Sequence, residues 1–263
     1  MYNFEYQAPK SVAEAAKLAA KEDAKVMAGG MTLIPTLKQR LAKPSDVIDL
    51  GKIAELKGIK KEGNAIVIGA MTRHHDVANS DVVKSAIPAL AHLAAHIGDP
   101  AVRNRGTCGG SIANNDPAAD YPSAVLALNA TIVTNKRKIA ADDYFKGMFE
   151  TALAPDEIIT AVSFPIPEKA AYMKFPNPAS RYAIVGVFVA KTGNAVRVGV
   201  TGAAPCAYRQ TEMEAALTKS FTPDAIKSVV QKQDGLNTDI HASAEYRAHL
   251  VGVMARRAVT AAG

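Results

Sequence analysis

Two glycine pairs, each closed by a nearby hydroxyl residue, constrain this chain more than any other feature. They are Ala28-Gly29-Gly30-Met31-Thr32 and Thr107-Cys108-Gly109-Gly110-Ser111. The first lies between a strand-like Lys25–Met27 and a helix-like Leu33–Leu41, and amides of such a turn converge where anions bind. Two such turns suggest a pyrophosphate held between them, while a plain tight turn is the alternative for each one alone.

Composition and charge indicate a globular protein without a nucleic-acid partner. The 263 residues are 48% hydrophobic, enough for one large domain or two modest ones. Lys and Arg number 31 against 25 Asp and Glu, but these charges are scattered instead of forming a basic track. No apolar segment is long enough to cross a membrane, and the N-terminus lacks a signal peptide pattern. We therefore expect a cytoplasmic protein with no membrane span.

The cysteines and histidines offer no metal site. Cys108 and Cys206 are the only cysteines, so neither a disulfide framework nor an iron–sulfur cluster is expected in this chain. His92 and His96 have helical spacing but lack a third ligand. Because no cysteine cluster can hold iron–sulfur, any redox chemistry requires an organic cofactor. No nucleophilic or paired-carboxylate constellation is present either.

The pattern of elements predicts an α+β fold. The opening reads as a βαβ unit, in which Leu33, Leu37 and Leu41 are expected on one buried helix face. From about Leu56 the pattern changes to hairpins, with a turn at Gly63-Asn64. The remaining elements of the first 170 residues include a helix over 81–97 interrupted at Pro88, a helix over 123–128 that Asp120 is placed to cap, and strands over 131–134 and 158–164.

A stretch with four prolines over 165–178 is predicted to be a linker, which puts a domain boundary near residue 170. The expected domains are 1–170, with lobes of about 1–55 and 56–170, and 171–263. The second domain should hold a hairpin over 182–202 and a helix over 244–261. It is therefore expected to combine an antiparallel sheet with helices.

Three long motifs resemble one known family. They cover Ala28–Pro35, Ile97–Thr107 and Gly109–Asp120, and further similar blocks lie over 156–160 and 179–186. The chain resembles the FAD-binding medium subunit of the molybdenum hydroxylases, which include aerobic carbon monoxide dehydrogenase and enzymes of the xanthine dehydrogenase type. The resemblance implies a two-lobed FAD-binding domain of the PCMH type, followed by a carbon monoxide dehydrogenase flavoprotein-like C-terminal domain.

The resemblance also implies which residues contact FAD. Both glycine turns would contact the diphosphate, through Ala28, Gly29, Gly30, Met31, Thr32 and Leu33, and through Thr107, Gly109, Gly110 and Ser111. Asp120 would bind a hydroxyl-bearing part of FAD, unless it serves only as a helix cap. Ile159 and Lys174 match positions near the flavin ring, although Lys174 is equally read as a surface lysine. For Arg103 and Arg105, structural ion pairs are favoured over phosphate contacts.

The function implied is electron transfer. A small 2Fe–2S subunit would pass electrons from a large molybdenum-cofactor subunit to FAD in this chain, and FAD would pass them to an external acceptor. The assembly would be a dimer of heterotrimers. The alternatives are a self-contained FAD-dependent oxidoreductase and a non-catalytic nucleotide-binding module. Met31-Thr32 and Asn114-Asn115 depart from frequent His-Ser and His-Ala pairs of the family, which leaves the acceptor open.

Overall fold

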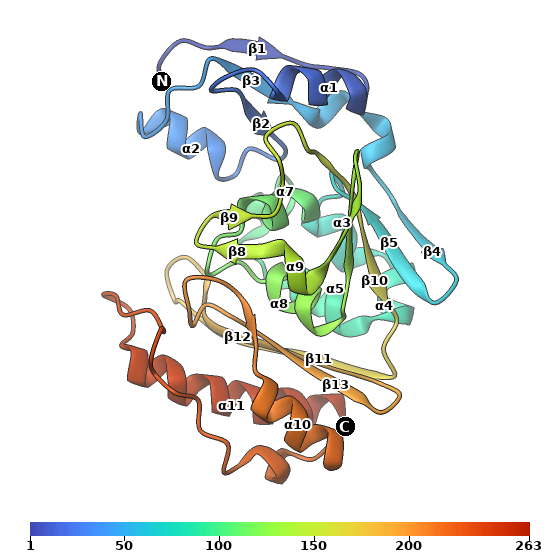
Figure 1. Cartoon of the computed structure of the whole chain (residues 1–263), viewed down its shortest axis with the longest axis vertical. Coiled ribbons are helices and arrows are strands. Elements are labelled where there is room, and N and C mark those ends of the chain that lie inside the picture. The colour runs from blue at the N-terminus through green and yellow to red at the C-terminus, as the bar shows by residue number, and fades with distance from the viewer.

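The computed structural model describes residues 1–263 and consists of three lobes stacked along the long axis (Figure 1). Each lobe is built on a sheet of its own. Chain order follows the stack, because the N-terminal lobe lies at one end and the C-terminal lobe at the other. The second lobe therefore contacts both of the others.

The first lobe is a small parallel sheet with two helices. Its strands lie in the order β1-β3-β2. Ser11 caps α1 by accepting a hydrogen bond from the Glu14 amide at 3.2 Å, as the sequence predicts. The elements of this lobe are β1 (Glu5–Gln7), α1 (Val12–Ala19), β2 (Lys25–Met27), α2 (Leu33–Lys38), β3 (Asp46–Asp49) and two 3-10 turns (Leu50–Lys52, Ala54–Leu56).

The predicted burial of Leu41 is wrong. Helix α2 ends at Lys38, and Arg40 has φ 60°, so the chain leaves the helical path before it reaches Leu41. The Leu41 side chain is 74% exposed, whereas Leu37 is buried.

The second lobe is an antiparallel sheet of order β4-β5-β10-β6-β7, packed against short helices. The predicted turn at Gly63-Asn64 joins β4 to β5, and Pro88 begins α5, where it separates two helices as expected. The elements are β4 (Ile59–Glu62), β5 (Ala65–Gly69), α3 (His74–Asn79), α4 (Asp81–Ala86), α5 (Pro88–Ala95), α6 (Pro100–Arg103), α7 (Cys108–Asn114), α8 (Tyr121–Ala127), β6 (Thr131–Thr134), β7 (Lys138–Ala140), α9 (Ala141–Tyr144), β8 (Phe145–Gly147), β9 (Glu150–Thr151) and β10 (Ile159–Pro165).

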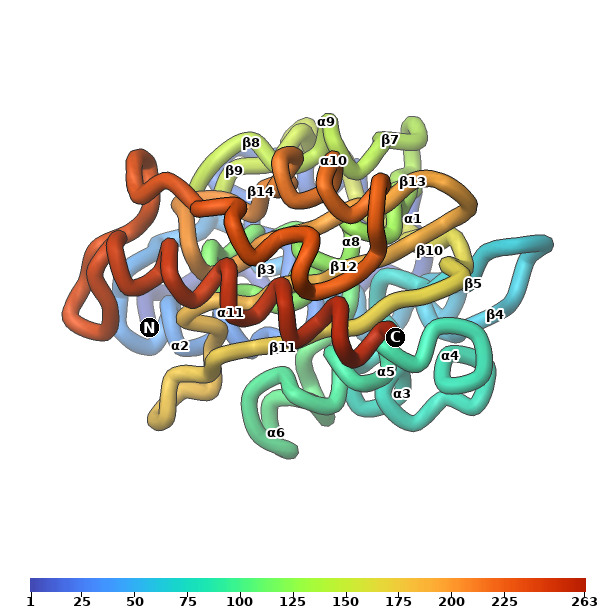
Figure 2. Tube along the Cα trace, turned by 90° about the horizontal axis from the view of Figure 1, so that it is seen from below, coloured from blue at the N-terminus to red at the C-terminus, as the bar shows by residue number.

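The third lobe is a four-stranded antiparallel sheet with a long helix on one face. Figure 2 shows α11 running across β11 and β12, and the helix and the sheet share an apolar core. Residues 169–176 of the proline-rich stretch predicted as a linker form β11, an edge strand, and of the four prolines only Pro176 lies in that strand, at its last position. The elements are β11 (Lys169–Pro176), β12 (Ala183–Thr192), β13 (Ala195–Thr201), β14 (Tyr208–Arg209), α10 (Thr211–Lys219), a 3-10 turn (Pro223–Ile226) and α11 (Ala244–Ala262). None of the helices is both long and apolar enough to cross a membrane.

The two glycine turns meet where the first lobe contacts the second. A Cβ atom added to Gly29 would lie 2.0 Å from the carbonyl oxygen of Arg105, so only glycine allows this backbone contact. A Cβ atom added to Gly110 would lie 3.1 Å from the Cβ of Ala28. The close approach of the lobes therefore depends on glycine, which has no side chain, at both positions.

We expect Gly29→Ala to lower the free energy of unfolding by roughly 1–3 kcal/mol, because the added methyl group overlaps the Arg105 carbonyl. Gly252→Ala is the matched control: it lies inside α11, where the nearest atom to an added Cβ is the Arg256 guanidinium at 3.4 Å. That change should raise the free energy of unfolding by up to about 1 kcal/mol. Urea denaturation of both variants checks the pair, and equal stabilities would refute the lobe contact.

Candidate functional site

The first glycine turn presents free backbone donors. Gly30 has φ 75°, and the amides from Gly29 to Thr32 donate no hydrogen bond within the chain. Thr32 precedes α2 but its side chain does not cap the helix. Consecutive unpaired amides in a turn with a positive φ form a concave arrangement suited to an anion. This turn is the part of the chain best prepared for a phosphate group.

The second glycine turn is internally bonded. The Cys108 and Gly109 amides donate to the carbonyls of Thr72 and Ala70, at 3.0 and 2.9 Å. The Gly110 amide donates to Thr107 Oγ1 at 3.1 Å, and the Ser111 amide donates to the Thr107 carbonyl at 3.0 Å. This turn therefore offers a ligand the Ser111 hydroxyl, but few free amides.

Asp120 is part of a buried ion pair and does not cap a helix. Its side chain makes no capping bond to α8, contrary to the sequence prediction. Its Oδ1 accepts hydrogen bonds from Lys174 Nζ at 2.8 Å and from the Tyr172 hydroxyl. The Lys174 side chain is only 7% exposed, so reading it as a surface lysine is wrong.

The environment of Asp120 has opposing electrostatic effects. Burial raises the pKa of the Asp120 carboxyl, while the Lys174 ammonium and the Tyr172 hydroxyl act against that rise. Burial, followed by the charge of Asp120, raises the pKa of Tyr172 well above its usual value, so its hydroxyl stays protonated and donates. Both bonds are made to Oδ1, which leaves Oδ2 as the oxygen that can accept from a further hydroxyl group.

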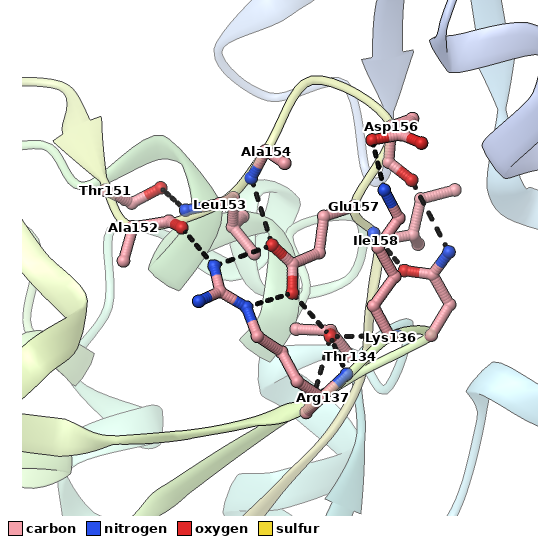
Figure 3. A network of polar contacts seen from close by, with 11 residues as sticks. Thr134, Lys136, Arg137, Thr151, Ala152, Leu153, Ala154, Asp156, Glu157 and Ile158 are labelled. Atoms are coloured by element: carbon pink, nitrogen blue, oxygen red, sulfur yellow. Dashed lines mark hydrogen bonds and ion pairs between the residues drawn. The ribbon is translucent and has the colours of Figure 1, made fainter.

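Hydrogen bonds to the segment just before Ile159 fix the position of that residue. Figure 3 shows the Glu157 carboxylate accepting from Arg137, from Thr134 Oγ1 at 2.7 Å and from the Ala154 amide at 3.0 Å. The bonds from Arg137 lower the pKa of Glu157 to about 2. Ile159 itself is 5% exposed and packs in the core of the second lobe.

The two arginines near the second turn form no ion pair, so that prediction is wrong. Arg103 donates instead to the carbonyls of Ile97 and Gly98, each at 3.1 Å. Arg105 is exposed beside the first glycine turn, which its carbonyl contacts. Two surface hollows of about 410 and 430 Å³, next to Asn135 and next to Lys57, are lined by no residue of either glycine turn.

Sequence reasoning missed how the third lobe holds the segment before Asp120. Thr201 Oγ1 donates to the Ala119 carbonyl at 2.6 Å, and the Gly202 amide donates to the Pro117 carbonyl at 2.8 Å. The buried Arg247 of α11 donates to the Gly202 and Ile184 carbonyls. These contacts join residues that are 45 or more positions apart and leave no local signal in the sequence.

Sequence reasoning also missed a buried histidine that packs against the second turn. The His74 ring lies beneath Gly106, where an added Cβ would be 2.6 Å from Nε2, and it packs on Tyr121 with ring centroids 5.4 Å apart. Burial, followed by the charge of Arg103, lowers the pKa of His74 to about 4. Its Nδ1 has no partner, so a charged ring would be strongly disfavoured.

Together, free amides at one glycine turn, a second turn against it and a buried carboxylate in an α+β fold fit a ligand that carries phosphate and hydroxyl groups, as FAD does. Comparisons with known proteins agree. Residues 2–167 match the family model described as FAD binding domain in molybdopterin dehydrogenase, and residues 170–262 match the CO dehydrogenase flavoprotein C-terminal domain. The chain belongs to the family of FAD-binding medium subunits of molybdenum hydroxylases.

Individual relatives match over nearly their full length. The chain is 37% identical to the carbon monoxide dehydrogenase medium chain of Hydrogenophaga pseudoflava, over 98% of this chain and 96% of that one. It is also 37% identical to the nicotine 6-hydroxylase medium subunit of Paenarthrobacter nicotinovorans, with the same coverage. A crystal structure of Cu,Mo-CO dehydrogenase matches with a TM-score of 0.92 and 35% identity, over 100% of this chain and 98% of that one. The chain is thus the FAD-binding type of oxidoreductase subunit, with the α+β fold predicted from its sequence.

We expect His74 to make stability depend on pH. Unfolded histidine takes up a proton near pH 6.5, but folded His74 does so only near pH 4. The unfolded state therefore binds more protons between these values, and up to about 3 kcal/mol of stability is lost as the pH falls from 6.5 to 4. His74→Gln should flatten this part of the stability profile, whereas His75→Gln, at the exposed neighbouring position, should not. Urea denaturation of the wild type and both variants between pH 6.5 and 4 measures this loss of stability.

We also expect strong coupling between Asp120 and Lys174. Asp120→Asn leaves a buried ammonium without a counter-charge and should cost about 3–5 kcal/mol of the free energy of unfolding. The double change Asp120→Asn with Lys174→Met should cost at least about 1 kcal/mol less than the sum of the single changes. The same cycle at the half-exposed pair Lys136–Asp156 should give a coupling under about 1 kcal/mol. Additive effects at Asp120 and Lys174 would contradict the buried pair.

Proposed function

We propose that this chain binds FAD between its first two lobes and transfers electrons from a partner subunit to an external acceptor. The observation that carries the proposal is the row of free amides at Gly29 to Thr32, facing the second glycine turn. The free amides of the first turn are donors that suit an anion, and the Ser111 hydroxyl lies in the turn packed against them, so the residues present fit a diphosphate. When bound, FAD supplies the redox chemistry, and the protein supplies position and charge.

Each site residue predicted from the sequence has a role in this proposal. The first turn donates amides to the diphosphate, from Ala28 through Gly29, Gly30, Met31 and Thr32 to Leu33. Gly110 lets the two turns come together and Gly109 packs the second turn on Ala70, and the hydroxyls of Thr107 and Ser111 in that turn can donate to the cofactor. Asp120 accepts from a cofactor hydroxyl through Oδ2. Lys174 and Ile159 lie toward the flavin ring, and the ammonium favours the reduced, more negative form of the cofactor.

The domain division is part of the proposal. A FAD-binding domain of residues 1–170, with lobes of about 1–55 and 56–170, is followed by a domain of residues 171–263. The family-model ranges of 2–167 and 170–262 support this division, as does the sheet that begins with β11 at Lys169. The contacts from Thr201 and Gly202 explain why the second domain matters for the site: it holds the segment before Asp120.

The partners in the proposal are a small 2Fe–2S subunit and a large molybdenum-cofactor subunit, arranged as a dimer of heterotrimers in the cytoplasm. Relatives named as medium chains and subunits support a multi-subunit assembly. Both cysteines of this chain are free, and no group of three or more His, Cys, Asp or Glu side chains in it could hold a metal ion. An electron relay to the flavin would therefore come from another chain.

We expect the purified chain to bind FAD at least roughly 100-fold more tightly than FMN, because FMN lacks the second phosphate that the paired turns accommodate. Fluorescence titration of the flavin-free protein with both compounds measures this ratio. Gly110→Val should weaken FAD binding roughly tenfold, since its side chain would stand against Ala28. Gly147→Val, in strand β8, is the control, because the nearest atom to an added Cβ there is Glu150 Oε2 at 3.4 Å and no positive φ is required. Equal affinities for FAD and FMN would contradict the diphosphate assignment.

The partner proposal predicts that the isolated, FAD-loaded chain is not bleached by the substrate of the complex. When the chain is purified with its native partners, the same substrate should bleach the flavin under anaerobic conditions. Metal analysis of that complex should find iron and molybdenum. Rapid bleaching of the isolated chain by an organic substrate would instead favour a self-contained oxidoreductase.

A further inference from the structure

Alternate residues of the edge strand β11 face different cores. Ala171 and Met173 pack with α11 in the core of the third lobe, whereas Tyr172 lies in the core of the second lobe. Side chains two positions apart on a strand share a face, so Lys174 points to the same side as Tyr172. One strand of the third lobe therefore directs a hydroxyl and an ammonium together towards the second lobe, where both bind Asp120.

The Tyr172 ring is fixed in that position by its neighbours. It is 2% exposed and stacks on Phe188, the residue opposite it on β12, with ring centroids 6.1 Å apart. Gly186 lies two positions from Phe188 on the same face of β12, and a Cβ atom added to it would overlap the Tyr172 hydroxyl. The hydroxyl therefore reaches Asp120 only because position 186 has no side chain.

The two donors share one oxygen of Asp120. Tyr172 and Lys174 both donate to Oδ1, and no group of the chain donates to Oδ2. Although Oδ2 has no partner, it is not one of the fully buried polar side-chain atoms. The 4% of the Asp120 side chain that is exposed therefore includes Oδ2, which is open to a ligand.

Two donors on one oxygen also fix the rotation of the carboxylate. Rotation about the Cβ–Cγ bond of Asp120 moves Oδ1 away from Tyr172 and leaves a buried hydroxyl without an acceptor, which costs free energy. With Lys174 as the only donor, the ammonium would be shared between the two oxygens and Oδ2 would turn inwards. The Tyr172 hydroxyl thus holds Oδ2 in the direction of the solvent.

We propose that Tyr172 is a positioning residue for the cofactor, because its hydroxyl keeps Oδ2 of Asp120 turned outwards to accept from a hydroxyl group of FAD. This inference rests on the proposed function, since it requires FAD to bind beside Asp120. A carboxylate oxygen with a fixed direction loses less freedom on binding, so the site selects for a ligand with a hydroxyl group at this place. Gly186 contributes to the same selection, because it leaves the room that the Tyr172 hydroxyl occupies.

Ligand selectivity tests the proposal, because a merely structural role of Tyr172 would change the affinity for all ligands alike. The ligands are FAD, an analogue without the hydroxyls of the ribityl chain and an analogue without those of the ribose. Tyr172→Phe removes only the hydroxyl and keeps the ring on Phe188, whereas Gly186→Ala displaces the hydroxyl and keeps the tyrosine. Tyr144→Phe is the matched control, at a buried tyrosine whose hydroxyl donates to the Ile112 carbonyl. Fluorescence titration of the flavin-free proteins gives the dissociation constants.

The wild type should bind FAD about tenfold to a hundredfold more tightly than one of the two analogues, which identifies the hydroxyl that Asp120 binds. This preference should fall at least about threefold in Tyr172→Phe and in Gly186→Ala, and should be unchanged in Tyr144→Phe. An unchanged preference in Tyr172→Phe would overturn its role, and so would a wild type that binds FAD and both analogues equally. Failure of the wild type to bind FAD would instead overturn the proposed function.

Discussion

The contact between backbone atoms of two lobes is the constraint on which the rest of the structure depends. Gly29 approaches the Arg105 carbonyl so closely that a methyl group would overlap it, and within the second lobe Gly109 packs on Ala70 almost as closely. Glycine is required at these positions for space more than for φ. The first lobe shares apolar contacts with Met71 and Ile158 of the second lobe, and these contacts set its orientation. A small parallel sheet is thereby fixed on a larger antiparallel one.

The buried ion pair of Asp120 and Lys174 imposes a second constraint, because its charges lie away from water. Two charges that are nearly fully buried cost free energy unless their hydrogen bonds are satisfied. Here Tyr172 and the His96 carbonyl complete the set, so residues from α5, α8 and β11 must be in place together. The charged groups of the candidate site thus depend on the packing of the second lobe against the third.

Local patterns in the sequence predicted the elements and both glycine turns, because Gly-Gly pairs, Pro88 and the Ser11 cap act within a few residues. The family resemblance added the site residues. The same patterns failed where distant contacts decide: a cap was predicted for Asp120, but Lys174 and Tyr172, more than 50 residues away, bind its carboxylate instead. The predicted burial of Leu41 was wrong because Arg40 takes a left-handed conformation that the hydrophobic periodicity does not reveal. The bonds from Thr201, Gly202 and Arg247 could not have been predicted, since their partners are carbonyl groups that every residue carries.

The bonds between the third lobe and the segment from Pro117 to Ala119 have a consequence for evolution. This segment is part of the second lobe by sequence, yet β12 and β13 hold its carbonyl groups. Because carbonyls are the same in every residue, most side chains of either partner can change without losing these bonds, provided that position 201 keeps its hydroxyl. A fusion that exchanged the C-terminal domain for an unrelated one would lose them all at once. The two domains are therefore free to diverge in sequence, but only as an inherited pair.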